Sequence, residues 1–555
     1  MPSYQAADLL WLLRVDFGGS PHYISTEPLT ITRDDGTTIA YSGGLTEPAY
    51  SESLSRFTYS RDALTLAIEA IFDNLDLAEH RRRGFLLSNA TCELAAVFRV
   101  AGTIQQTYEE RIRVIDGWMS EPVYADPARP PGYVTFSINS NPYDVIGTFF
   151  KSTMRLTETS MDALITTGQP LSDESVDKVY PFVFGNPGVF FSATDSATSY
   201  TRGTPAYAIN RTNISKEAQN VLIAGHHVGA TEVRIRAGKL TAVTGLSVTN
   251  GFDKFRNPIA YVDVSSQSTA FKEKEEFWVT WYQTPTSSLP TRGLSAKNPF
   301  STSGVVNGAG DLLIWACTLG DFKVDHGAWG AARDYLNAFR FSGYVNDPDT
   351  TVWEWIQEIA KMIPTLTIRN GPAGIYPIIQ DLRSTTTGAT SITAGPDFHR
   401  LGPVSLEGDQ GDIVNTVVIE FAYNAQGEIS QSYVVIGEPD ETEPERFSSL
   451  HAAASISRYG IREKSIEAPF IYDRSTAALV AEATVQIHGQ IPETVEYKAG
   501  IAYSYLMLGD QVALTDSELY LTDQICTVCE RAWDGDGWVI KLLIEDDPAR
   551  DPRYS

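Results

Sequence analysis

The chain has 555 residues, a formal charge of -26 and 43% hydrophobic residues, a length that predicts about three or four domains of about 150 residues each. The apolar content is ordinary for a globular protein and excludes wholesale disorder. The negative charge argues against a surface that wraps DNA, because phosphate binding needs clustered Lys and Arg.

The sequence gives no sign of export or membrane insertion. No apolar run approaches the length of about 20 residues that a membrane helix requires. The first residues lack the basic region and apolar core of a signal peptide, so we expect synthesis in the cytoplasm. Four cysteines are too few for a disulfide scaffold in such a chain.

Residues 1–150 are dominated by strand signals. Strand signals separated by Gly and Asp turns predict strands at residues 9–17, 22–25, 30–33, 37–41, 64–69, 92–100, 111–115 and 133–138. Residues 64–69, 92–100 and 111–115 alternate between apolar and polar side chains, as half-buried strands do. One helix is predicted at residues 75–83, ending near Gly84. The pattern predicts a small barrel or sandwich, and we place an N-terminal β-barrel domain at residues 1–150.

A second strand-rich region follows a segment of Ser, Thr and Asp at residues 151–175, which we interpret as a connection. Short strands are predicted at residues 179–185, 206–209, 221–224, 232–236, 260–264 and 277–282. Pro and Gly at residues 284–310 indicate a loop. We therefore expect a β-rich inserted domain at residues 151–305.

The next region, residues 306–400, has the clearest helix signals. Helices are predicted at residues 309–319, 327–338 and 352–363. Thr351 and Glu354 have capping-box spacing at the start of the third helix, whose apolar face includes Trp355, and Pro364 ends it. A hairpin is expected after it, turning at residues 370–374. We interpret this α+β helical module as packing structure.

Residues 401–555 return to strand patterns. Residues 401–445 contain ten acidic side chains and no Lys or Arg, and residues 438–445 are predicted to form an exposed loop, since such charge is costly to bury. Asp473 is expected to cap a helix at residues 475–488. Strands are predicted at residues 415–423, 506–514, 524–533 and 538–544. We expect a second β-barrel here, so the predicted fold is mainly β with α+β modules and two small barrels.

Cys526 and Cys529 are the candidate metal ligands. One such pair supplies at most two ligands, whereas a structural zinc site usually has four, and residues three apart on a strand point to opposite faces. Cys92 and Cys317 are distant in sequence but could join them around a metal or a cluster. We favour ordinary buried cysteines.

Other polar groups are weaker candidates for chemistry. His226 and His227 are adjacent and are expected to be exposed in a turn. Asp321, Asp325 and His326 are expected to cap and link helices. No nucleophile elbow, Walker loop or zinc-protease helix is found. We therefore assign no catalytic, cofactor or metal residue and expect a protein that is not an enzyme.

The order of these features resembles that of phage tail-tip and baseplate hub proteins, including those of gene transfer agents. The resemblance covers nearly the whole chain, and each of its motifs has low specificity alone. It is carried by the stretches LLWLLRVDF (9–17), VYPFVFG (179–185), LIAGHHVGATEVR (222–234), GDLLIW (310–315), DPDTTVWEW (347–355), NTVVIEFAY (415–423) and LGDQV (508–512), with the helix at residues 475–488.

The resemblance implies a homotrimer with two β-barrels per subunit, which forms a ring that adapts a sixfold tail tube to a threefold tip. Implied partners are the distal tail protein or tail tube protein, the tape-measure protein, and a central fibre or tip protein. DNA would pass through the channel without specific binding. Such a protein is found in the virion and made in the host cytoplasm. The cysteines are too scattered for the iron–sulfur clusters of some hubs, and no hydrolase signature follows the second barrel.

The alternative is a carbohydrate-active or receptor-binding phage protein that holds sugars on aromatic side chains. Trp278, Trp281 and Tyr282 are the candidates, although core packing is the simpler role for them. A glycan-binding and turnover assay separates the two hypotheses.

Overall fold

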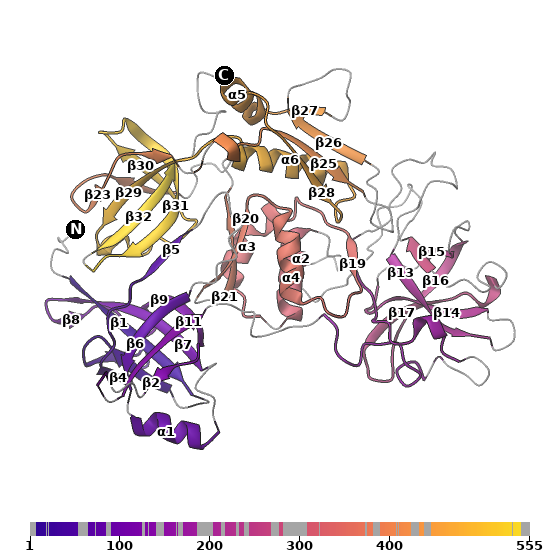
Figure 1. Ribbon diagram of the computed structural model, residues 1–555, viewed down its shortest axis with the longest axis horizontal. Helices are drawn as coiled ribbons and strands as arrows, with labels where there is room; N and C mark the ends of the chain where they lie inside the picture. The colour runs from indigo at the N-terminus through magenta and orange to yellow at the C-terminus, as the bar shows by residue number, and fades with distance from the viewer. Residues whose placement is uncertain are drawn as a thin grey trace. The chain divides into compact units, whose positions relative to one another are not determined.

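The computed structural model describes most of the chain. The described residues are 7–17, 19, 21–53, 65–72, 74–84, 90–124, 128–130, 132–139, 149–162, 164, 170–185, 204–212, 217–228, 232–237, 243–267, 277–280, 308–320, 322–371, 374–380, 389–406, 408, 410–422, 432–437, 446–535 and 537–544. Strands predominate in both of its compact units (Figure 1), which confirms the mainly β, multidomain fold class. Unit 1 consists of Met1–Asp144, Thr365–Ile413 and Gln490–Ser555, and unit 2 of Val145–Pro364 and Val414–Gly489.

Unit 1 begins with a 10-stranded sheet in the order β10-β11-β9-β7-β1-β2-β4-β3, in which β6 also pairs with β11 and β8 with β7. Its strands are β1 (Ala7–Asp16), β2 (Pro21–Ser25), β3 (Leu29–Thr32), β4 (Thr38–Gly43), β6 (Thr65–Ile71), β7 (Thr91–Val100), β8 (Thr103–Ile104), β9 (Ile112–Met119), β10 (Val123–Tyr124) and β11 (Tyr133–Asn139). The predicted helix is confirmed as α1 (Asn74–Arg82).

Strand β1 is buried on both faces because its apolar residues are consecutive. Trp11, Leu13 and Val15 point into the main core of unit 1, whereas Leu10 and Leu12 belong to a second cluster on the opposite face. The second cluster includes Ile31 of β3 and Tyr41 of β4, so the β3–β4 hairpin covers that face. Alternation along a strand sends successive side chains to opposite sides.

The last part of unit 1 is an 8-stranded sheet in the order β22-β30-β31-β32-β29-β23, with β24 on β29 and β5 on β31. Its strands are β5 (Ser51–Ser53), β22 (Thr390–Thr393), β23 (Phe398–Arg400), β24 (Ser405–Leu406), β29 (Glu493–Ala499), β30 (Gln511–Asp516), β31 (Leu521–Trp533) and β32 (Trp538–Ile544). Most of these strands are antiparallel, and β22 pairs with β30 in parallel.

The predicted hairpin of unit 1 is confirmed as β20 (Leu366–Gly371) and β21 (Gly374–Ile379). Gly509, in the turn before β30, packs against it with φ at 85°. A Cβ atom at this position would lie 2.3 Å from Cγ2 of Ile378, so the close approach requires glycine. The hairpin contributes Ile378 to the same core as the two sheets.

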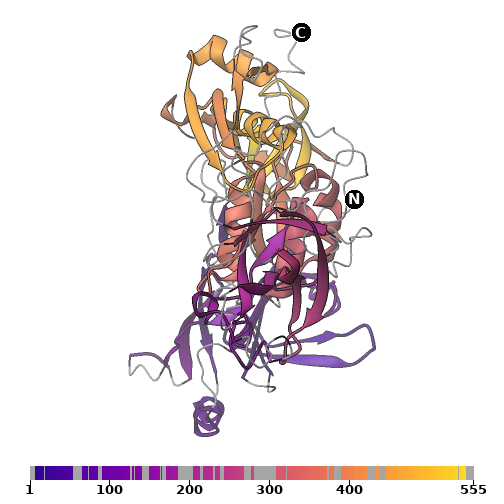
Figure 2. The same cartoon turned by 90° about the vertical axis from the view of Figure 1, so that its right-hand side faces the viewer.

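Unit 2 contains a closed barrel with the strand order β13-β14-β17-β16-β15-β18, which is drawn in magenta tones in Figure 2. The strands are β13 (Thr204–Arg211), β14 (Ala218–Ala224), β15 (Glu232–Ala237), β16 (Val243–Phe252), β17 (Pro258–Asp263) and β18 (Phe277–Thr280). Its interior is filled by small and branched side chains such as Val221, Val233, Ile235 and Val262, so the barrel has a packed core.

The helical module of unit 2 agrees closely with the sequence patterns. Its elements are α2 (Ala309–Leu319), α3 (His326–Leu336) and α4 (Val352–Lys361), with the short pair β12 (Phe182–Phe184) and β19 (Gly343–Val345). The capping box of Thr351 and Glu354 is present, and Asp325 accepts hydrogen bonds from two amides at the start of α3. Both caps satisfy backbone donors that a helix start leaves free.

The remaining part of unit 2 is an α/β layer. A 4-stranded sheet in the order β27-β26-β25-β28 packs against α6. The elements are β25 (Thr416–Phe421), β26 (Ser432–Gly437), β27 (Arg446–Ser448), β28 (Glu463–Ala468), α5 (Leu450–Tyr459) and α6 (Arg474–His488). Asp473 caps α6 as predicted. Helix α5, begun by Ser449, is not predicted, because its Ala- and Ser-rich sequence has little apolar periodicity.

Strand pairing closes a barrel within the region for which the sequence predicts a β-rich inserted domain. Among the described residues, strand pairing closes a barrel in unit 2 at residues 204–280, while the sheets of unit 1 are joined as open paths. The two barrels expected at residues 1–150 and 401–555, and the four domain boundaries, therefore stay predictions. Across the described chain, no helix is both long enough and apolar enough to span a membrane.

Candidate functional site

The candidate site is the junction between the two sheets of unit 1, where the chain leaves the first sheet after β4 and β5 pairs with β31 of the second (Figure 1). The pairing is antiparallel and places Glu52 opposite Arg531. It is extended by a hydrogen bond from the Trp533 amide to the Tyr50 carbonyl at 3.0 Å. The Trp533 indole also donates to Glu47 at 2.7 Å. Strand β5 thus joins chain segments that are very distant in sequence.

Four aromatic rings pack together at this junction. Trp11 of the first sheet lies 6.5 Å from Trp533 of the second in an edge-to-face arrangement, and Tyr50 lies 5.9 Å from Trp538. Trp11 and Trp538 are fully buried. Offset and edge-to-face ring pairs contribute stability beyond their buried area, so the junction is an extended aromatic core shared by both sheets.

Arg531 is fully buried inside this aromatic core. Its guanidinium carbon lies 3.9 Å from the ring centroid of Trp538, and Nη2 donates to the Ser504 carbonyl at 3.0 Å. The nearest carboxylate oxygen is Oε1 of Glu52, 3.9 Å from Nη1. An unpaired buried charge is costly, and these contacts offset that cost.

Glu52 is the buried anion of the junction. Burial raises the pKa of its carboxyl group, whereas the Tyr50 hydroxyl and the guanidinium groups of Arg531 and Arg369 lower it, with burial as the larger effect. Arg369, on β20, donates to the Ser53 carbonyl. One set of buried charges therefore connects the β20–β21 hairpin, β5 and β31. These charges fix the register of the strands and do not arrange a reactive group.

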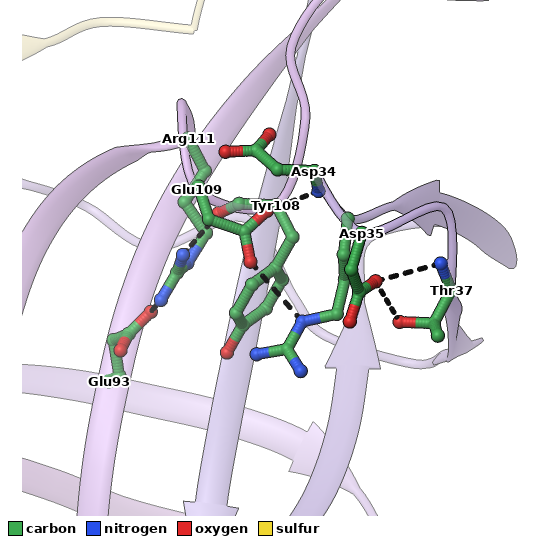
Figure 3. Close-up of polar contacts among 8 residues, drawn as sticks. Asp34, Asp35, Thr37, Glu93, Tyr108, Glu109 and Arg111 are labelled. Atoms are coloured by element: carbon green, nitrogen blue, oxygen red, sulfur yellow. Dashed lines mark hydrogen bonds and ion pairs between the residues drawn. The ribbon is translucent and has the colours of Figure 1, made fainter.

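A second polar cluster fastens the β3–β4 hairpin to the outer face of the first sheet (Figure 3). The Tyr108 ring lies between two guanidinium groups, with Arg111 at 3.7 Å and Arg33 at 5.0 Å from its centroid. Glu109 accepts from the Asp34 amide at 3.0 Å and pairs with Arg33 at 3.2 Å.

The other charged groups of this cluster are also paired. Arg111 donates to Glu93 at 2.7 Å, and Asp35 accepts from the Thr37 amide and hydroxyl at 2.8 and 2.6 Å. Paired carboxylates of this kind are typical of a loop that is held in place. These ion pairs and hydrogen bonds support the hairpin.

The four cysteines are all buried and free. Burial raises the pKa of the Cys317 thiol to about 12 and raises the pKa of Cys92, so these thiols stay protonated and unreactive. Cys526 and Cys529 donate to backbone carbonyls within the second sheet. Within the described ranges, no group of three or more potential metal ligands is present.

The expectation of exposed histidines is wrong for His226. This side chain is 7% exposed and stacks on Phe182 with ring centroids 5.8 Å apart. Its Nε2 accepts from the Val183 amide at 3.1 Å, and its Nδ1 donates to the His227 carbonyl at 3.0 Å. Burial lowers the pKa of His226 to about 4. The adjacent strand β12 covers the turn, which sequence periodicity alone does not reveal.

The remaining sequence candidates do not form a site in the described part of the chain. Asp325 caps α3 as expected, with His326 as the first helical residue. Trp278 is part of β18, between β13 and β15, and is half-buried. Asp321, Trp281, Tyr282 and the acidic segment 438–445 lie outside the described residues. The sugar-binding alternative therefore stays a prediction.

Sequence reasoning missed the residues of the junction. Arg531 and Glu52 appear in the sequence as ordinary strand charges. A signal was present in the stretch Cys526 to Trp533, where Glu530 and Arg531 interrupt an otherwise apolar strand next to a tryptophan. A charged residue in such a strand indicates that its side chain is paired when buried, but the sequence does not show which residue it pairs with.

No protein-family model and no curated protein matches this chain. Among solved structures, it is similar to a tail protein from Neisseria meningitidis MC58, with 10% identity, a TM-score of 0.37 and 97% of both chains covered. It is also similar to the 43 kDa tail protein of prophage MuSo2 from Shewanella oneidensis, with 9% identity, a TM-score of 0.37 and coverage of 97% of this chain and 98% of that chain.

Prophage tail protein gp18 from Listeria monocytogenes EGD-e matches with 6% identity, a TM-score of 0.32 and coverage of 98% of this chain and 96% of that chain. All three are tail proteins, the class of protein that the sequence resembles. The identities and TM-scores are too low to establish a common fold.

Proposed function

We propose that this chain is a structural hub of a phage or phage-like tail. In the proposed assembly, three copies form a ring that adapts a sixfold tail tube to a threefold tip. The role is structural, and the protein belongs to the virion tail after synthesis in the host cytoplasm. The proposal brings together the order of sequence motifs and the architecture of unit 1.

The observation that carries the proposal is the shared core of the two sheets in unit 1. Trp11, Val15 and Leu94 of the first sheet belong to the same buried cluster as Val495 and Trp538 of the second. One polypeptide therefore holds two β-sheets in one compact unit, although the sheets are far apart in sequence. Three such polypeptides around one axis would present six of these sheets, which suits a ring between sixfold and threefold neighbours.

The charge of the chain fits a protein that surrounds DNA in transit. At a formal charge of -26, phosphate groups are repelled rather than held. We accordingly propose that DNA passes without specific binding. The proposed partners are the distal tail protein or tail tube protein, the tape-measure protein, and a central fibre or tip protein.

Analytical ultracentrifugation of the purified chain, combined with negative-stain imaging, tests this function. The expected species has about three times the 61.0 kDa mass of the chain, and its images show a ring with six density maxima. A chain that stays monomeric at all concentrations, or a ring with three equal maxima, contradicts the proposal. The variant Arg531→Met disrupts the junction. Its rings are expected to lose their six density maxima under conditions in which unit 2 is still folded.

A further inference from the structure

The turn between β16 and β17 in unit 2 exposes two large aromatic side chains. Phe252 is 54% exposed and Phe255 is 46% exposed. The neighbouring Lys254 and Arg256 are also exposed, whereas Asp253 and Asn257 are buried. The turn therefore directs apolar and cationic groups outward and keeps its carboxylate inside. Exposed aromatic residues next to Arg are typical of protein interfaces.

Buried hydrogen bonds hold this turn in one conformation. The Asp253 carboxylate accepts from the Asn257 amide at 2.7 Å, from the Asn257 side chain at 2.8 Å and from the Tyr180 hydroxyl at 2.9 Å. The Lys254 amide donates to the Ser160 carbonyl at 3.0 Å. Two exposed phenylalanines on a fixed backbone lose little conformational entropy when a partner binds.

The backbone at Arg256 supports a role in binding. Its φ is 66°, a left-handed conformation that glycine adopts without steric cost but that is unfavourable for a long side chain. Strained residues of this kind are concentrated at functional sites. We therefore take Arg256 as a candidate binding residue.

Charge distinguishes Arg256 from its neighbour. Lys254 pairs with Asp162 at 3.0 Å. Arg256 has no ion-pair partner among the residues that the structure describes. Arg256 and the exposed rings of Phe252 and Phe255 are complementary to a partner surface that is apolar in its centre and has carboxylates around it. The chain itself, with 69 acidic side chains, supplies such carboxylates in every additional copy.

We propose that the β16–β17 turn docks onto a second copy of this chain, with Phe252 and Phe255 as the apolar anchors and Arg256 as the charged one. The inference rests on the proposed trimer. A closed ring of three copies needs two different surfaces on each protomer, because each contact is heterologous. The turn is one of these surfaces. It is too small to form a stable interface alone and acts as the energetically dominant part of a larger contact.

The test is sedimentation velocity over a dilution series of the full-length chain. Three variants are compared with the wild type: the double variant Phe252→Ser with Phe255→Ser, the single variant Arg256→Gly, and Arg256→Glu. The concentration at which the trimer dissociates is expected to rise about tenfold or more for the double variant and for Arg256→Glu. Tyr433→Ser is the matched control, because Tyr433 is an exposed aromatic residue of the same unit, and it is expected to dissociate like the wild type.

Arg256→Gly separates docking from folding. Glycine relieves the unfavourable φ, so this variant is expected to unfold at the same temperature as the wild type or higher while its trimer dissociates more readily. If Phe252→Ser with Phe255→Ser fails to fold, Arg256→Gly and Arg256→Glu decide the question.

The possible outcomes distinguish this inference from the proposed function. A wild-type trimer whose dissociation is unchanged in all three variants overturns the inference and leaves the hub function intact. In that case the turn serves a different occupant, such as another tail protein or a membrane surface. A wild type that is monomeric at every concentration overturns both.

Discussion

The two units of this protein each contain a large aromatic cluster, and the clusters differ in how they treat charge. In unit 1, the buried guanidinium of Arg531 lies 3.9 Å from the ring centroid of Trp538 and 5.9 Å from that of Tyr50. In unit 2, Phe149 and Trp315 surround Trp355, with centroids 5.4 and 6.4 Å from its ring. Phe184 also packs edge-to-face on Trp355 at 5.2 Å, so these contacts are between rings.

This difference in buried charge corresponds to the different structural roles of the two clusters. The cluster of unit 2 joins a helical module to adjacent segments, and hydrophobic packing is sufficient there because the helices are already specified locally. The junction of unit 1 aligns strands that meet only in the folded protein. A buried ion pair is a poor source of stability, but a wrong register would leave its charges unpaired. Arg531 and Glu52 therefore favour one alignment of β5 on β31.

The largest expected effect is on the cluster of unit 2. Trp355→Ala removes a side chain that is 3% exposed and should lower the free energy of unfolding by about 3–5 kcal/mol, because a cavity is left. Denaturant unfolding followed by circular dichroism measures this. Trp355→Phe, which keeps a ring, is expected to cost less, and a neutral result for Trp355→Ala would show that the apolar face of α4 is misassigned.

Breaking the junction tests the role of its buried charge. Arg531→Met keeps apolar volume over Trp538 but leaves Glu52 without a cation on β31, so we expect a loss of about 3 kcal/mol in the unfolding of unit 1. Adding Glu52→Gln should restore part of this loss. Arg400→Met, which removes a surface ion pair with Glu518, is the control and should change stability by less than about 1 kcal/mol. Equal effects of Arg531→Met and Arg400→Met would contradict the comparison.

A pH titration tests the burial of a histidine in unit 2. The pKa of His226 is lowered from its ordinary value of 6.5 to about 4, so the unfolded chain takes up a proton there more readily than the folded protein. The contribution of His226 to the free energy of unfolding is fully present above the pKa that this group has in the unfolded chain. It is lost as the pH falls through the pKa of the folded protein. Between about pH 7 and about pH 5 the unfolding free energy should fall by about 2 kcal/mol from this group.

The matching variants are His226→Gln, which should remove this part of the pH dependence, and His326→Gln, at the exposed start of α3, which should retain it. Stability is measured by denaturant unfolding at each pH. An unchanged pH profile in His226→Gln would show that the imidazole is not held neutral by burial.

The smallest expected effect concerns the start of α4. Thr351→Ala removes the hydroxyl that accepts from the Glu354 amide at 3.2 Å and should cost about 1 kcal/mol. Thermal unfolding of the full chain measures the change. Thr350→Ala, one residue earlier, is a control with little expected effect.

The helical module could be predicted from the sequence because its signals are local. The periodicity of α4, its capping box and Pro364 lie within fourteen residues of one another, counted from Thr351 to Pro364, and the structure reproduces them. The strands at residues 9–17 and 538–544 were also visible as short apolar runs. Their partners were not, since strand pairing depends on contacts between distant segments.

The same reason explains two features that the sequence did not reveal. Barrel closure at residues 204–280 depends on β13 meeting β18, and neither strand carries a distinctive sequence. The burial of His226 depends on β12, whose Val183 supplies its hydrogen bond. The junction of Glu52 with Arg531 is equally nonlocal, so both residues looked like ordinary surface charges.

The hydrogen bond between Trp533 and Glu47 spans 486 residues, which has a consequence for biosynthesis. A ribosome adds about 5–20 residues per second, so about half a minute to a minute and a half passes between the emergence of these two partners. During that interval Trp11 and Tyr50 are in water with no second sheet to cover them, and a nascent chain in this state is prone to aggregate. We expect the yield of native protein to depend on slow growth or on chaperones that shield the first segment until the last has been made.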